Sequence, residues 1–156
     1  MNVSFVMKDN IIPLSACLAK TIPHPSGKAD PGIDVPGHCI ITGEIAKEIV
    51  RRYFGSFHKE LFPPGFELAA SVHDVGKISP SFMERLYRNT RDYEFNSLPG
   101  LEDADPDLDK TWGGHAAVSQ AALDNAPKYI PQIAGRHHGY LPTDKYPADY
   151  VEFGGE

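Results

Sequence analysis

The sequence has few cysteines and no long apolar run, and each absence excludes a class of protein. Its two cysteines, Cys17 and Cys39, are too few for a disulfide framework and too far apart for a CxxC metal site. We expect both to be reduced thiols in a cytoplasmic protein. No apolar stretch approaches the length of a membrane span, and the first twenty residues lack the pattern of a secretory signal.

An excess of positive charge is also missing. The formal net charge is -6, from 15 lysines and arginines against 21 aspartates and glutamates. The clearest charge run, residues 102–109, is acidic, and we interpret it as a solvated loop. Proteins that bind DNA through their own surface usually have a positively charged face. If nucleic acid is the substrate, bound metal ions or another domain must therefore supply positive charge.

The apolar residues that are present repeat with helical spacing, and no segment alternates apolar and polar residues for long. At 156 residues the chain suffices for one domain. We predict an all-α fold, a helical bundle with long loops at residues 23–36 and 89–111. The predicted helices cover about residues 14–20, 37–53, 66–75, 114–125 and 128–138, with a further helix that begins at Ser79-Pro80. In the 37–53 helix, Ile41, Ile45 and Ile49 form one apolar stripe that includes His38.

Five of the seven histidines fall at or near the ends of these predicted helices: His38, His73, His115, His137 and His138. The pair His73-Asp74 is central, because imidazole and carboxylate are both good ligands for divalent transition metals, and a carboxylate can bridge two ions. A single histidine on an apolar helical face is more often a core residue. Several helices that each present one predict a shared metal centre, since each buried imidazole needs a partner. His138 is either a ligand or a residue that faces the substrate.

Lys77 follows the pair by one helical turn. An ammonium there could meet a phosphate oxygen of a substrate. The alternative, a solvated lysine at a helix end, remains open from the sequence alone.

The segment His73-Asp-Val-Gly-Lys77, followed by Ile-Ser-Pro-Ser-Phe82, resembles the defining motif of the HD-superfamily phosphohydrolases. Further segments stand in the order Ala19-Lys-Thr21, His38-Cys39, Gly113-Gly-His115 and Arg136-His-His-Gly139. This order resembles the HD nuclease domain that begins the CRISPR type I helicase-nuclease, over roughly residues 19 to 156.

The resemblance implies a cytoplasmic hydrolase of antiviral defence, a metal-dependent endonuclease that cleaves phosphodiester bonds of mainly single-stranded DNA in CRISPR interference. It implies one or two divalent ions (manganese, iron, cobalt or nickel, with magnesium as a further candidate). His38, His73 and Asp74 would hold one ion, while Asp74 would bridge to a second ion held by His115, His137 and His138. Asp74 and Lys77 are the expected catalytic residues. The implied partners are single-stranded DNA, the CRISPR surveillance complex (Cascade) and a helicase domain in the parent protein, with no membrane.

The chain departs from the family pattern after His138. The family places a further aspartate ligand far downstream on its own helix, whereas here only Asp144 and Asp149 follow. We therefore expect residues 1–156 to form a single HD domain truncated before its last helix or helices, with the helicase domain absent.

Two other functions remain open. One is an HD-type nucleotide phosphohydrolase with the same metal site, which hydrolysis of a nucleotide panel but not of polynucleotide would favour. The other is a module that docks on a larger complex without catalysis.

Overall fold

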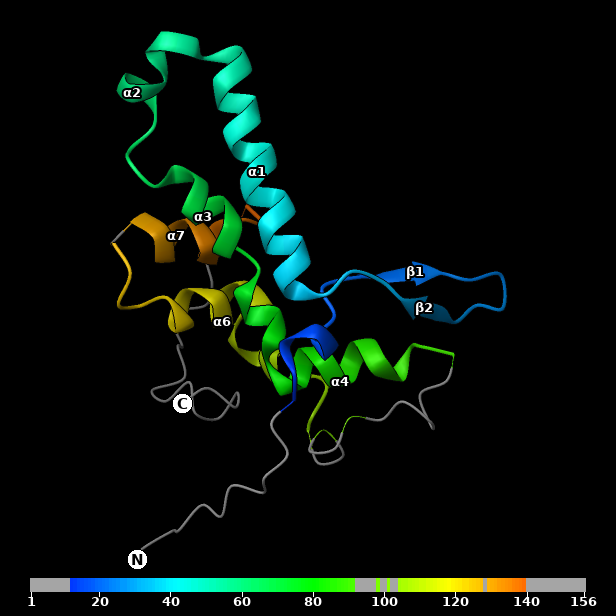
Figure 1. The fold of residues 1–156 in the computed structure, drawn as a ribbon. Helices are drawn as coiled ribbons and strands as arrows, with labels where there is room; N and C mark the ends of the chain where they lie inside the picture. Colours follow the sequence, from blue (N-terminus) through cyan, green and yellow to red (C-terminus); the bar gives the residue numbers. More distant parts are fainter. Residues whose placement is uncertain (1–11, 92–97, 99–100, 102–103, 128, 140–156) are drawn as a thin grey trace, which may run out of the picture.

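In a computed structural model, the protein is described at residues 12–91, 98, 101, 104–127 and 129–139, and its architecture there is mostly helical (Figure 1). The all-α prediction is confirmed, with the addition of one small two-stranded sheet. The α-helices are α1 (Val35–Tyr53), α2 (His58–Leu61), α3 (Phe66–Val72), α4 (Pro80–Arg88), α6 (Gly114–Ala122) and α7 (Tyr129–Arg136). Short 3-10 helices cover η1 (Leu14–Ala16), η2 (Gly55–Phe57), η3 (Val75–Ile78) and η4 (Leu108–Trp112). No helix among these described residues is long and apolar enough to cross a membrane.

The long helix α1 begins two residues earlier than predicted, because Asp34 caps it. The Asp34 carboxylate accepts a hydrogen bond from the Gly37 backbone N–H at 2.7 Å, and Pro36 occupies the first turn. Helix α3 packs along α1 at Gly43, where a Cβ atom would lie only 2.0 Å from the Ser71 hydroxyl. The glycine therefore permits the close approach of the two helices.

The predicted apolar stripe on α1 does not face the core. Ile41, Ile45 and Ile49 are 50%, 53% and 47% exposed, whereas the buried residues of α1 include Gly43 and Val50. Apart from His38, which contacts Asp74, the stripe therefore does not mark the buried side of α1. Hydropathy does not register the close approach of α3 at Gly43, which lies on a different side of the helix.

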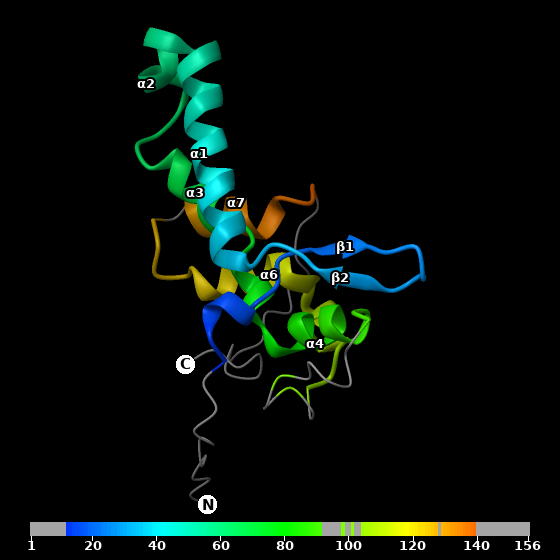
Figure 2. The same cartoon turned by 45° about the vertical axis from the view of Figure 1, so that its right-hand side comes forward.

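A small antiparallel hairpin joins β1 (Thr21–Pro23) and β2 (Ala29–Pro31). Strand β2 lies inside the predicted loop at residues 23–36, whereas β1 ends at its first residue. It projects from the helices beside α4 (Figure 2). Its turn includes Gly27 at φ +82°, and the backbone of Ala29 pairs with the segment after α4 through hydrogen bonds to Asn89 and Arg91. Three-residue strands are too short for the alternation that identifies strands in a sequence.

The predicted helix 66–75 ends early, at Val72. His73 and Asp74 form the turn that joins α3 to η3, and η3 leads into α4. The predicted start of α4 is confirmed, since the Ser79 hydroxyl accepts a hydrogen bond from the Phe82 backbone N–H at 3.4 Å. The His–Asp pair is thus held at a junction between helices.

The acidic run before α6 is only partly a solvated loop. Asp105 and Asp107 are exposed, but Asp109 in η4 is completely buried and paired with Arg85 of α4. Helix α6 then packs against η3 and α7, which brings the ends of α3, α6 and α7 together beside the first turn of α1.

Candidate metal centre

The Asp74 carboxylate lies between two groups of histidines. Its Oδ2 atom is 2.9 Å from Nε2 of His38 and 3.2 Å from Nε2 of His73. Its Oδ1 atom is 3.2 Å from Nε2 of His115 and 3.3 Å from Nε2 of His137. The ligand atoms within each of two sets, His38-His73-Asp74 and His115-His137-His138, lie within 4.8 Å of one another. One carboxylate therefore connects two sets of ligands, and each set has the chemistry that divalent transition metals prefer.

Backbone carbonyls orient two of the imidazoles. Nδ1 of His73 donates to the Ala70 carbonyl at 2.7 Å, and Nδ1 of His137 donates to the Ala134 carbonyl at 2.6 Å. A carbonyl oxygen only accepts, so each Nδ1 carries the proton, and in the neutral ring Nε2 presents its lone pair. This outer hydrogen bond is the one that metal-ligating histidines usually make.

The arrangement leaves buried acceptors facing one another. Among the described residues, neither Asp74 Oδ1 nor His137 Nε2 has a hydrogen-bond partner, although both atoms are buried. Two acceptors at 3.3 Å repel unless a positive charge lies between them, either a proton on the imidazole or a metal ion bound by both. The donor set therefore fits a metal ion.

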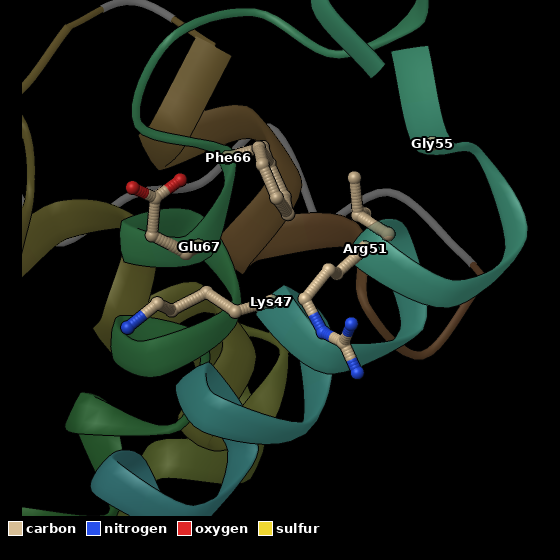
Figure 3. A pocket seen from close by; sticks show the side chains of 6 residues that line it. Lys47, Arg51, Gly55, Phe66 and Glu67 are labelled. Carbon is tan, nitrogen blue, oxygen red and sulfur yellow. The ribbon is translucent and has the colours of Figure 1, made fainter. Parts of the chain in front are cut away.

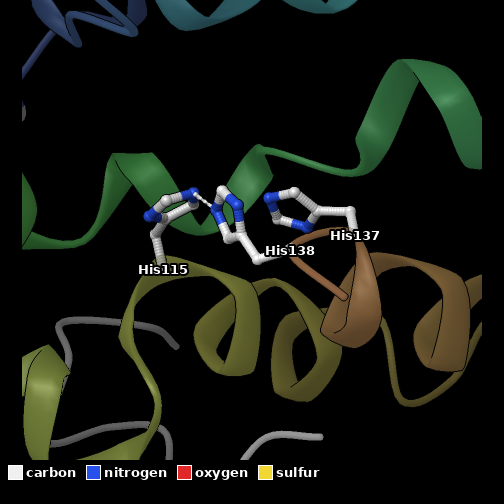
Figure 4. Close-up of side chains that lie close together, drawn as sticks. All are labelled: His115, His137 and His138. Atoms are coloured by element: carbon white, nitrogen blue, oxygen red, sulfur yellow. Dashed lines mark hydrogen bonds between the residues drawn. The ribbon is translucent and has the colours of Figure 1, made fainter. Parts of the chain in front are cut away.

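Figure 4 shows the second set: His115 at the start of α6 points toward His138, while His137 and His138 extend from the end of α7. Nε2 of His138 lies 3.0 Å from Nε2 of His115. Gly139 follows at φ +82°, and its backbone N–H bonds to the Arg136 carbonyl and ends the helical turn. That turn lets two consecutive histidines approach one site.

Lys77 contacts the same oxygen of Asp74 as His38 and His73 do. It is only 8% exposed, and its Nζ atom is 2.8 Å from Asp74 Oδ2, so the alternative of a solvated lysine is wrong. Burial acts to raise the pKa of Asp74, but its contacts with the His115 imidazole and the Lys77 ammonium hold that pKa well below the usual range. Asp74 is therefore a carboxylate in the folded protein.

All the residues predicted from the sequence as ligands come together at this centre: His38, His73, Asp74, His115, His137 and His138. His24 instead lies beside the hairpin turn, with Nδ1 at 2.9 Å from the Ser26 hydroxyl. The sequence reasoning missed the carbonyls of Ala70 and Ala134, because backbone groups carry no sequence signal. It also missed Ser119, whose buried hydroxyl accepts a hydrogen bond from the Gly76 backbone N–H at 2.8 Å.

The best-defined cavity of the described surface is elsewhere. It measures about 480 Å³ and lies between α1 and α3, lined by Lys47, Val50, Arg51, Gly55, Phe66 and Glu67 (Figure 3). None of these residues belongs to either ligand set. A smaller cavity of about 380 Å³, on the outer side of α7, includes Arg136 and His137 in its lining.

The fold and the arrangement of histidines around an aspartate define a protein of the HD class. The sequence matches the model of the family described as "Cas3, HD domain" over residues 19–152, and the chain belongs to that family. No curated protein and no solved structure matched the chain. Membership of the family implies a metal-dependent nuclease role in CRISPR systems.

Proposed function

We propose that the chain is a nuclease that binds one or two divalent transition-metal ions and hydrolyses phosphodiester bonds of single-stranded DNA in CRISPR interference. The position of the Asp74 carboxylate carries this proposal: one oxygen faces His38 and His73, and the other faces His115 and His137. Only a carboxylate offers one acceptor oxygen to each ligand set together with a negative charge.

The histidines would hold the ions as neutral Nε2 ligands, with Asp74 between them. Bound ions of this kind lower the pKa of a coordinated water, polarise the phosphate and stabilise the leaving oxygen. The chain's own residues fix the geometry: the carbonyls of Ala70 and Ala134 hold His73 and His137 in one tautomer. Lys77 would balance the charge of Asp74 and, when the carboxylate is engaged elsewhere, would be available to a phosphate oxygen of the substrate.

The proposal extends to the setting of the reaction. With a net charge of -6, the chain does not supply an overall positive field for DNA. A helicase domain in the parent protein and the surveillance complex Cascade would deliver the single strand, and bound metal would supply local positive charge.

The test is cleavage of circular single-stranded DNA by the metal-stripped chain after addition of manganese, iron, cobalt, nickel or magnesium. A circular substrate has no ends, so contaminating exonucleases cannot imitate the result. Cleavage that needs a transition metal and is lost in the His73→Ala/Asp74→Ala variant supports the proposal. Asp107→Asn is the matched control, because it removes an exposed carboxylate in a loop away from the ligand sets.

Nucleotides are assayed in parallel with the same metals. Hydrolysis of a nucleotide with no cleavage of DNA would replace the proposed substrate while keeping the metal centre. Absence of metal binding by the chain would contradict the proposal at its first step.

A further inference from the structure

Asp109 is the most completely enclosed carboxylate of the described residues, with no exposed surface. It accepts two hydrogen bonds from the Arg85 guanidinium, from Nη1 to Oδ1 at 2.5 Å and from Nη2 to Oδ2 at 2.8 Å. The Ser81 hydroxyl donates a third at 3.1 Å. The desolvation cost of burying two charges offsets much of the attraction between them, so such a pair adds little to stability. Its two parallel hydrogen bonds instead fix the orientation of both side chains.

The backbone connects this pair to the metal centre. Asp109 lies in η4, and only five residues separate it from His115. Two of the five are Gly113 and Gly114, at φ +101° and +73°, and no side chain caps the start of α6. Glycine loses much conformational freedom on folding, so this connection is intrinsically loose. His115, the second residue of α6, depends on contacts outside the connection for its placement.

A second path runs through side chains. The Arg85 guanidinium lies over the Phe82 ring, with its central carbon 5.0 Å from the ring centroid. The His115 ring in turn meets Phe82 with centroids 5.0 Å apart and planes inclined at 66°. Arg85 therefore fixes Asp109 at one end of the connection and supports the ring against which the His115 imidazole rests.

We propose that Arg85 and Asp109 form a positioning pair that fixes His115 within the set His115-His137-His138. The inference rests on the proposed function, because it assumes that this set binds an ion. His115 rests on the Phe82 ring directly, whereas the first ligand set is reached from that ring only through Lys77, whose Nζ lies 5.6 Å from the ring centroid and contacts Asp74. Loss of the pair should therefore weaken binding of the ion held by His115 more than binding of the ion held by His38 and His73.

The test measures manganese stoichiometry and affinity by calorimetry on the full, metal-stripped chain, with each ion assigned by His38→Ala and His137→Ala. In Asp109→Asn we expect the affinity of the His115-set ion to fall about 10- to 100-fold, as for other residues that orient ligands. Arg85→Lys keeps the buried cation but loses the second hydrogen bond, so we expect a smaller loss. The ion assigned to His38 should lose less affinity than the ion of the His115 set in both variants.

Glu84→Gln is the matched control. Glu84 is also buried on α4, and it pairs with an arginine of its own helix, Arg88. It should bind both ions as the unaltered chain does. Two outcomes would overturn the inference, because they would mean that the pair acts only on general stability. One is a loss of metal affinity in Glu84→Gln equal to that in Asp109→Asn. The other is an equal loss of affinity for both ions in Asp109→Asn.

A second measurement needs no metal. In the metal-free chain with labelled histidines, the imidazole NMR signals of His115 should broaden or shift in Arg85→Lys while those of His73 stay in place. Unchanged His115 signals, with unchanged binding of two ions, would overturn the positioning role alone. An unaltered chain that binds no ion would overturn the proposed function, and the positioning of a metal ligand with it.

Discussion

Nε2 of His137 lies 3.3 Å from Oδ1 of Asp74, and neither atom has a hydrogen-bond partner among the described residues. The Ala134 carbonyl occupies the other ring nitrogen of His137, so the neutral imidazole has only a lone pair to offer Asp74. Two buried acceptors in this position are costly without a cation between them. This relationship is the reason to expect that metal binding and the stability of the site are coupled.

Asp74→Asn should lower the affinity of the protein for both ions. Asparagine keeps the shape of the side chain but removes the charge and one acceptor oxygen, and both ligand sets face this residue. The loss for each ion should exceed the 10- to 100-fold typical of residues that only orient ligands. Metal content after equilibrium dialysis measures it.

His38→Ala is the comparison for that variant. His38 contacts only Oδ2 of Asp74, so we expect one ion to be lost and the other to remain. If Asp74→Asn also lost a single ion, the bridging position of Asp74 would be wrong.

Metal affinity should fall as the pH is lowered. Ligand imidazoles must be neutral, and hydrogen bonding to Asp74 outweighs burial and raises the pKa of His73. Burial lowers the pKa of His38, so His73 takes up a proton at a higher pH than His38 does. Between pH 7.5 and 5.5 we expect the affinity for the ion held by His73 to fall about tenfold or more. Competition titrations with a chelator at constant ionic strength measure the change; an affinity that stays constant over this range would contradict histidine ligation.

Gly76→Ala should destabilise the fold by about 1–3 kcal/mol or more. A Cβ atom at Gly76 would lie 2.2 Å from the His115 carbonyl oxygen and 2.5 Å from the Ser119 backbone nitrogen, so η3 and α6 would have to separate. Urea unfolding followed by circular dichroism measures the change in the free energy of unfolding. Gly27→Ala tests the conformational freedom of glycine instead. Nothing lies within 4 Å of the Cβ position at Gly27, so only its φ of +82° opposes the change. Gly76 has no positive φ, so a loss in Gly76→Ala no larger than that in Gly27→Ala would contradict the close approach as the limiting factor at Gly76.

Ile130→Ala should lower the free energy of unfolding much more than Ile133→Ala, although both residues lie on α7. Ile130 is 1% exposed, and its truncation should cost about 2–5 kcal/mol. Ile133 is 47% exposed, so its truncation should cost about 1 kcal/mol or less. The same urea experiment compares them. A large loss in Ile133→Ala would mean that this residue is covered in solution.

The positions of several predicted ligands could be derived from local patterns. Gly113-Gly114 before His115 and Gly139 after His138 mark the helix ends beside these histidines, and the His73-Asp74 pair marks the centre of the motif. These signals act over a few residues, which is why they can be read in a sequence without knowledge of its partners.

The face that each helix buries was decided by tertiary packing. Ile45 lies on the apolar stripe of α1 but is 53% exposed, whereas Gly43, an inconspicuous residue in a hydropathy pattern, is buried where α3 approaches at Ser71. The acidic run predicted solvent around Asp109, but Arg85 lies opposite it, on a helix more than twenty residues earlier in the chain. Hydropathy treats each residue by its own chemistry, whereas burial depends on what another segment offers at that point.

The sequence by itself therefore determined the mostly helical class, the family and the set of residues that meet at the metal centre. Only the tertiary structure decided how they meet: that Asp74 divides its two oxygens between two sets of imidazoles, that Lys77 is buried against it, and that backbone carbonyls select the tautomers of His73 and His137. The physical reason is that the side-chain type decides which residues can bind a metal ion, while their distances, burial and protonation depend on how separate helices pack together.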